Sequence, residues 1–152
     1  MKRPLHNPII LTIALLLIIP CVSIAGQFKV VRVFDGNTVK AIGHDIEIKV
    51  RLVGIDAPET KKGKRKPGQP YSQKATKFLA KLVLNKTIEV KGYGVDRYNR
   101  ILGLIFAQNT NVNLELVRAG LAEFYRGRSP KFFDIAPYRK AESEAKDAGI
   151  GM

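Results

Sequence analysis

Apolar and polar residues alternate along much of the first two thirds of the chain, as they do in half-buried strands. Phe28 and Val30 alternate with Lys29, and residues 46–52 repeat the same period of two. With the turn residues between them, these patterns predict strands at residues 27–34, 39–42, 46–55 and 87–91, and residues 101–106 form a further apolar run.

Three segments show helical periodicity instead. Residues 72–84 carry apolar side chains on one face, with Ser72 as the expected N-cap. Residues 113–119 predict a short helix that stops at Gly120, and residues 137–148 predict a last helix. Strands with one inserted helix, followed by two helices, fit several small α+β arrangements, and periodicity alone does not choose among them.

The N-terminus has the pattern of a secretory signal. Lys2 and Arg3 give it a basic start, residues 9–19 are apolar, and residues 23–25 offer small side chains for cleavage before Gly26. An uncleaved membrane anchor is the alternative. The apolar run is short, however, for the roughly 20 residues that a spanning helix needs.

Cleavage would leave a single domain over residues 26–152, because that length suits one hydrophobic core and no internal repeat or linker divides it. Cys21, the only cysteine, would leave with the signal, so we expect neither a disulfide nor redox chemistry. We expect a monomer that is secreted or periplasmic, with a membrane-anchored form as the alternative.

Net charge adds a preference for polyanions. The chain has 26 Lys and Arg against 13 Asp and Glu, and without Lys2 and Arg3 the balance is 24 against 13, a net charge of +11. Such a balance favours DNA, RNA or an anionic membrane face without choosing among them, and it also serves solubility. The basic run at residues 61–66 is either a solvated loop or an electrostatic collar for a nucleic-acid backbone.

One predicted strand end gathers the groups of a phosphodiester site. The alternation turns Arg51 away from the apolar face of its strand. Ala57 precedes a proline and favours extended geometry, so we expect the strand to break near Pro58. Arg51 then lies close to Asp56 and Glu59. Arginine binds phosphate through two hydrogen bonds, and carboxylates hold a hard cation or a water, so the segment suggests chemistry on a phosphodiester.

Four segments, in this order, resemble the staphylococcal nuclease family. Residues 35–38 resemble its Asp-Gly-Asp-Thr turn, and residues 51–60 its active-site segment. Residues 96–100 resemble the segment with a second catalytic arginine, and residues 113–122 a helix and the turn after it. The likeness runs over about residues 30–149. It implies an α+β fold, a five-stranded OB-type β-barrel with three α-helices, which carries single-stranded nucleic acid on one face.

The resemblance also implies a mechanism. Arg51 and Arg100 would grip the phosphate more strongly as negative charge builds on it, which stabilises the transition state. Glu59 would orient and deprotonate the attacking water. The implied substrates are DNA and RNA, single-stranded or locally opened, cut with little sequence preference to leave 3′-phosphates.

Calcium is the cofactor that the resemblance implies. Asp56 and Asn37 would ligate it through their side chains and Ala57 through its backbone carbonyl, with Asp35 close by. The family usually has a second aspartate where this chain has Asn37. An amide oxygen can still coordinate calcium but brings no charge, so we expect weaker metal binding.

The same resemblance places three further residues along the nucleotide groove, namely Arg97, Tyr98 and Tyr125. A tyrosine there can stack on a base or donate a hydrogen bond to a phosphate. Asn99 stands where the family more often has glycine, and asparagine tolerates the left-handed turn geometry this position needs.

Two rival hypotheses remain. The first is an OB-fold module that binds nucleic acid but has lost catalysis, and Asn37 is the one step in that direction. Against it, Arg51, Glu59 and Arg100 are all present. The second is a basic protein that coats an anionic membrane or cell wall, which leaves the motifs unexplained.

Overall fold

The structure of the protein, a computed structural model, describes residues 26–60 and 68–152. The predicted signal sequence and the basic run at residues 61–66 lie outside the described residues. Five long strands make up most of a six-stranded sheet, in which the short β7 (Thr110–Asn111) pairs with β6: β1 (Gly26–Asp35), β2 (Thr38–Gly43), β3 (Ile46–Leu52), β5 (Thr87–Val95) and β6 (Ile101–Ala107). Shorter strands and three helices complete it: β4 (Ile55–Asp56), β7 (Thr110–Asn111), β8 (Glu123–Phe124), α2 (Ser72–Val83), α3 (Val112–Arg118) and α4 (Ala136–Asp147).

The five long strands close into a barrel. Neighbours pair in antiparallel fashion in the order β3-β2-β1-β5-β6, and a parallel pairing of β3 with β6 joins the two ends. Gly103 lies at this closure opposite Leu52, and a Cβ atom there would lie 2.9 Å from Val50 and 3.0 Å from Val90. Glycine therefore lets the strands meet, and the predicted five-stranded OB-type barrel with three helices is confirmed.

The alternation of the strands fills the barrel interior. Its inward side chains are mainly β-branched and fully buried, which suits a pleated, packed surface. They include Val30, Val39, Val50, Ile88 and Ile105. Helix α2 adds Leu79 and Val83, both with no exposed surface, and packs against β1.

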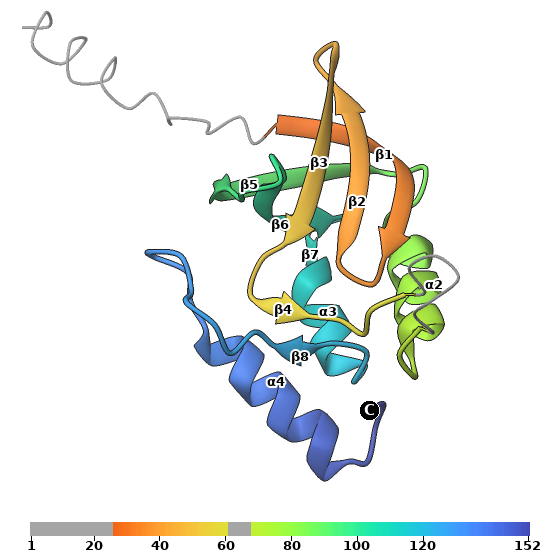
Figure 1. Cartoon of the computed structure of the whole chain (residues 1–152), viewed down its shortest axis with the longest axis vertical. Coiled ribbons are helices and arrows are strands. Elements are labelled where there is room, and N and C mark those ends of the chain that lie inside the picture. Colours follow the sequence, from red (N-terminus) through yellow and green to blue (C-terminus); the bar gives the residue numbers. More distant parts are fainter. Residues whose placement is uncertain (1–25, 61–67) are drawn as a thin grey trace, which may run out of the picture.

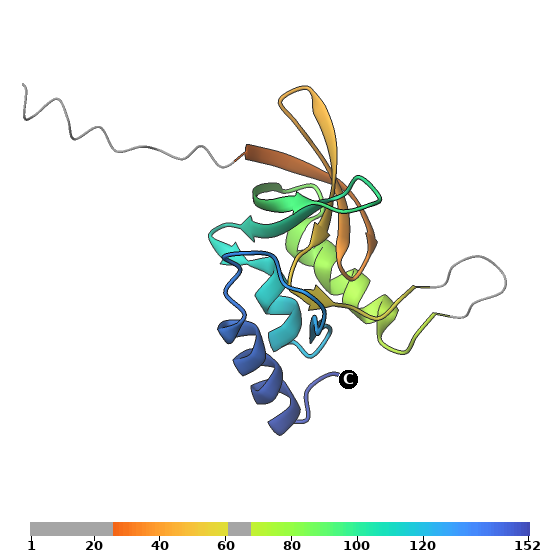
Figure 2. The same ribbon diagram turned by 60° about the vertical axis from the view of Figure 1, so that its left-hand side comes forward.

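Helices α3 and α4 lie side by side below the barrel (Figures 1 and 2). Asn113 on α3 is fully buried and makes three hydrogen bonds. Its Oδ1 accepts from the Ile105 N–H at 3.1 Å, and its Nδ2 donates to the carbonyls of Val53 and Gly103 at 2.9 and 3.0 Å. A buried amide with all these partners ties α3 both to the barrel and to the turn that follows β3.

Three boundary predictions were wrong. The strand that begins at Ile46 ends at Leu52, ahead of Pro58, because Gly54 adopts φ +78° and the Phe133 ring fills the space where its Cβ atom would stand. Only glycine accommodates both the positive φ and this close ring. The chain resumes as β4, which pairs with β8.

The start of α2 also differs from the prediction. Ser72 is the first helical residue and is buried, whereas the N-cap is Tyr71, at φ 64° and without a side-chain cap bond. The strand predicted to end at Lys91 continues to Val95. The stop at Gly120 is confirmed, with φ +61°.

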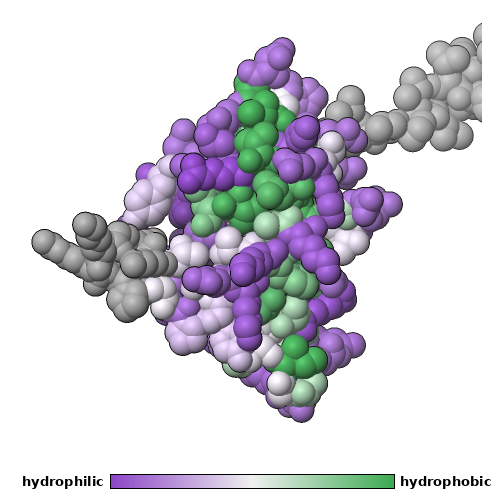
Figure 3. Space-filling view, turned by 90° about the vertical axis from the view of Figure 1, so that its right-hand side faces the viewer, coloured by the Kyte–Doolittle hydropathy of each residue, from purple (hydrophilic) through white to green (hydrophobic). Residues whose placement is uncertain are grey.

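The surface is largely hydrophilic. Seen from the side on which β1 and α2 lie, an apolar strip runs down the upper half between hydrophilic borders (Figure 3). Among the described helices, none combines the length and the apolar character needed to cross a membrane.

Candidate active site

The turn between β1 and β2 is pressed against the loop after β4. The Asn37 N–H donates to Asp35 Oδ1 at 3.0 Å, which closes the turn locally. A Cβ atom on Gly36 would lie 2.8 Å from the Cβ atoms of both Ala57 and Ala75. Glycine thus allows the turn to approach Ala57, and so brings Asn37 to the predicted metal site.

Asn37 joins β2 to β3. It is 2% exposed, and its backbone carbonyl accepts from the Leu52 N–H at 2.8 Å. Its Oδ1 accepts from Thr38 Oγ1 at 3.2 Å and from Arg51 Nη1. These two bonds use both lone pairs of the amide oxygen.

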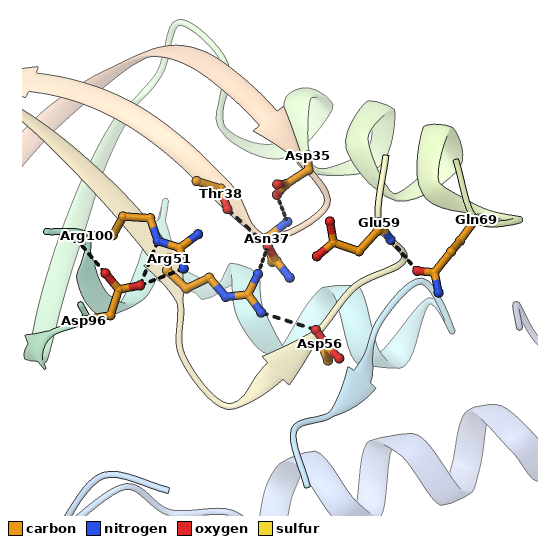
Figure 4. Close-up of polar contacts among 9 residues, drawn as sticks. All are labelled: Asp35, Asn37, Thr38, Arg51, Asp56, Glu59, Gln69, Asp96 and Arg100. Atoms are coloured by element: carbon orange, nitrogen blue, oxygen red, sulfur yellow. Dashed lines mark hydrogen bonds and ion pairs between the residues drawn. The ribbon is translucent and has the colours of Figure 1, made fainter. Parts of the chain in front are cut away.

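Arg51 is held from two sides. Figure 4 shows its guanidinium between Asn37 and Asp56, and Nη2 lies 3.2 Å from Asp56 Oδ1. The Arg51 side chain is 20% exposed and that of Asp56 59%, so the ion pair contributes little stability. Its effect is to orient the guanidinium, which keeps further N–H donors for a substrate phosphate.

Glu59 is fastened by its backbone to Gln69. The Glu59 N–H donates to Gln69 Oε1 at 2.6 Å, and the Gln69 N–H donates to the Glu59 carbonyl at 2.8 Å. In Figure 4 the Glu59 carboxylate extends toward Asn37 and away from Gln69. No sequence motif had pointed to Gln69. Its position just before α2 was the only available signal.

The turn at residues 96–100 holds the second arginine. Asp96 Oδ1 accepts from the backbone N–H groups of Tyr98 and Arg100 at 2.9 and 3.0 Å. Asp96 Oδ2 lies 2.7 Å from both Nε and Nη2 of Arg100, a two-pronged ion pair. Asn99 adopts φ 58°, as the turn was expected to require. No sequence pattern had identified Asp96 as the residue that orients Arg100.

Burial of the Asp96 carboxyl would by itself raise its pKa. The hydrogen bond from the Arg100 side chain, those from the N–H groups of Arg100 and Tyr98, and the Arg100 charge outweigh this effect. The pKa of Asp96 therefore lies below its ordinary value, and the ion pair with Arg100 persists at neutral pH.

Both arginines open onto one groove of about 450 Å³. Its polar and aromatic lining comes from three regions of the chain, and comprises Arg51, Asp96, Arg97, Tyr98, Arg100, Tyr125, Arg128 and Ser129. The Tyr98 ring is 63% exposed, with the guanidinium carbons of Arg97 and Arg100 at 4.9 and 5.3 Å from its centre. The structure thus brings together the predicted phosphate-binding and nucleotide-binding residues, and adds Arg128, which the sequence had not suggested.

A second cavity, of about 430 Å³, lies on the other side of the β4 loop. Asp56 and Ala57 line it, together with Tyr71 and Glu123. Residues 51–55 thus line the groove, and residues 56–58 line the second cavity.

The predicted metal ligands have the donor atoms that a hard cation requires. Asp35, Asn37, Asp56 and the Ala57 carbonyl are all oxygen donors, which suit a hard ion such as calcium. Within residues 26–60 and 68–152, no three His, Cys, Asp or Glu side chains are grouped closely enough to form a metal site by themselves. Because Asn37 Oδ1 already accepts two hydrogen bonds, it can ligate only if Arg51 or Thr38 releases it.

Comparison with known proteins agrees with this geometry. Residues 49–152 match the family model of staphylococcal nuclease homologues. A protein of Haemophilus influenzae named as an uncharacterized endonuclease is 35% identical over 151 residues, which are 96% of this chain and 79% of that protein. An uncharacterized endonuclease of Escherichia coli is 42% identical over 106 residues, 69% of this chain and 63% of the relative.

The micrococcal nuclease of Shigella flexneri is 35% identical over 133 residues, which are 82% of this chain and 71% of that protein. The segment matched by the family model contains Arg51, Glu59 and Arg100, whereas the turn with Asn37 precedes it. With two arginines on one groove of an OB-type barrel and a match over most of its length, the chain belongs to the staphylococcal nuclease family.

Proposed function

We propose that this protein is a secreted, calcium-dependent nuclease that hydrolyses DNA and RNA with little sequence preference and leaves 3′-phosphates. As a member of the family, it is a hydrolase of phosphodiester bonds. The observation that carries the proposal is the groove onto which Arg51 and Arg100 both open, with Glu59 on the loop that follows β4.

The two arginines would stabilise the transition state. Attack on a phosphodiester adds negative charge to the oxygens around phosphorus. Asn37 and Asp56 orient the Arg51 guanidinium, and Asp96 orients that of Arg100, before substrate arrives. Charges that need no reorganisation during the reaction stabilise the developing charge most effectively.

Glu59 would act on the attacking water. Its backbone is fixed by Gln69, and its carboxylate extends toward Asn37, which holds Arg51. A positioned carboxylate can orient the water and take its proton. When bound by Asp56, Asn37 and the Ala57 carbonyl, calcium would supply Lewis-acid stabilisation of the phosphate.

Other features support the substrate class. The groove arginines can bind the phosphates of the substrate, and the exposed rings of Tyr98 and Tyr125 can stack on its bases. Both kinds of contact are possible with any base sequence, in DNA or RNA. Stacking on those rings requires unpaired bases, which favours single-stranded or locally opened substrate. The pattern at residues 1–25 supports secretion.

Release of acid-soluble nucleotides tests the proposal directly. The purified protein is incubated with denatured DNA, first with calcium and then with excess chelator, beside an Arg51→Ala variant. We expect release that requires calcium and is lost in the variant. Release that persists in chelator would overturn the calcium requirement, and release by Arg51→Ala would remove Arg51 from the mechanism.

A binding module without catalysis is the second candidate, favoured by one observation. Asn37 replaces a carboxylate in the expected metal site, and its oxygen is engaged by Arg51 and Thr38. This candidate predicts no nucleotide release, together with DNA binding that weakens as salt rises. The same experiment therefore separates the two functions.

A further inference from the structure

Arg128 differs from the other arginines of the groove. Arg51 and Arg100 are held by carboxylates, and Arg97 lies over the Tyr98 ring. Arg128 is exposed, and among the described residues its side chain makes no hydrogen bond, ion pair or ring contact. A guanidinium on a groove wall that no acidic group neutralises is available to an anion.

The chain that carries Arg128 is placed by its own contacts. The Tyr125 N–H donates to the Gly54 carbonyl at 3.0 Å, which anchors the segment beside the turn after β3. Gly127 lies directly against the Tyr125 ring, where a Cβ atom would overlap the ring. The chain therefore folds back over Tyr125, and this bend brings Arg128 to the groove.

A neighbouring arginine shows that the placement is selective. Arg126, two residues earlier, lies 3.0 and 3.1 Å from the two carboxylate oxygens of Glu142 on α4. It is thus engaged in holding β8 to that helix and is absent from the groove lining. Arg126 therefore stabilises the fold, whereas Arg128 lines the groove.

We infer that Arg128 binds a second phosphate of the substrate strand, adjacent to the phosphate that is cleaved. The inference rests on the proposed function and extends it, since it says where the phosphate next to the cleaved one binds in the groove. With the scissile phosphate between Arg51 and Arg100, a single strand continuing along the same groove meets Arg128. Guanidinium groups bind phosphate oxygens through two parallel hydrogen bonds.

Neutral backbone linkages provide the test. One oligonucleotide carries a single phosphodiester in a backbone of methylphosphonates, and two others carry a second phosphodiester on its 5′ or its 3′ side. For the full-length protein with calcium, we expect both two-phosphate substrates to have a KM about tenfold lower than the single-phosphate substrate, because either phosphodiester of a pair can take the position that is cleaved. Arg128→Gln should remove that advantage, leave kcat unchanged and leave the single-phosphate substrate unaffected.

Matched variants guard the interpretation. Lys131→Gln removes a positive charge from the same segment but not from the groove lining, and should preserve the advantage. Arg128→Lys should restore part of it. Equal losses on all three substrates, or a wild-type protein that does not distinguish them, would overturn the inference.

Binding of the same oligonucleotides, followed by fluorescence anisotropy, separates the inference from the proposed function. If the protein cleaves nothing, the proposed function fails, yet Arg128→Gln should still weaken binding only of a two-phosphate oligonucleotide. The logarithmic salt dependence of that binding should lose about 0.7 in slope, as expected for one phosphate contact on a single strand. An unchanged slope and affinity would refute the phosphate contact itself.

Discussion

Arg51 and Arg100 face the same groove but are positioned in different ways. Arg100 is held by Asp96, four residues away, and the same carboxylate closes the backbone turn. Arg51 depends on Asn37, fourteen residues earlier, and on Asp56 beyond the β3–β4 turn. One arginine is therefore oriented by a local turn, and the other by the pairing of β2 with β3 and by the turn after β3.

The difference bears on how each arginine responds to change. A local turn can keep its geometry when a distant part of the domain moves, because its contacts lie within one short segment. The Arg51 site requires β2, β3 and the β4 loop to be in register together. Glu59 lies on the loop after β4, and Gln69, ten residues later, holds its backbone.

Glu59→Gln is expected to have the largest effect. The variant keeps the shape of the side chain but cannot take a proton, so turnover should fall by about 10²–10⁴-fold while nucleic-acid binding persists. Single-turnover cleavage and anisotropy measure the two properties, with Glu89→Gln on β5 as the control. If turnover is unchanged, Glu59 has no part in the mechanism.

Asp96→Asn tests the local side of the comparison. Loss of the two-pronged ion pair should loosen Arg100 and lower kcat about tenfold, with a small change in stability because the turn is at the surface. Rates and thermal unfolding measured at neutral pH check both points. A loss of folding comparable to that from a core substitution would show that this turn is not a local unit.

The lowered pKa of Asp96 predicts how the stability difference between wild type and Asp96→Asn depends on pH. Because the folded pKa lies below the ordinary carboxyl value of 3.8, the unfolded chain binds the proton more readily. The stabilisation from Asp96 is therefore complete above that ordinary value and is lost as the pH falls through the lowered folded pKa. The stability difference between wild type and Asp96→Asn should shrink accordingly in acid, and a difference that grows would contradict the assignment.

Gln69→Leu tests whether Glu59 needs its backbone partner. The change keeps the size of the side chain and removes the acceptor of the Glu59 N–H, so kcat should fall several-fold. The loss should vanish when Glu59→Gln is already present, since a misplaced glutamine has no proton transfer to lose. Equal losses in both backgrounds would mean that Gln69 acts on the fold and not on Glu59.

Asn37→Asp should give the smallest effect and concerns the metal. An added carboxylate should lower the half-saturating calcium concentration, because it contributes a charge that the amide lacks. Titration of activity with calcium measures the shift. If the midpoint does not move, Asn37 is not a ligand, and its role is the hydrogen bond to Arg51 that the structure shows.

Local features were predictable because a few neighbouring residues in the sequence determine them. The strand alternation and the turn at Asp35 follow from residue order alone, whereas the left-handed Asn99 was implied by the resemblance. The resemblance supplied the barrel, which periodicity could not choose. The end of β3 was missed because Phe133, about eighty residues away, determines what can stand at Gly54.

The sequence by itself determined which segments become strands and helices, and it placed Arg51, Glu59 and Arg100 in recognisable motifs. Only the tertiary structure decided that Gln69 fastens Glu59, that Asn37 Oδ1 is turned to Arg51, and that Arg128 shares their groove. The physical reason is the sequence separation over which each kind of interaction acts. Backbone preference and side-chain period act over a few residues, whereas these contacts exist only after strand pairing and loop packing have brought separate segments together.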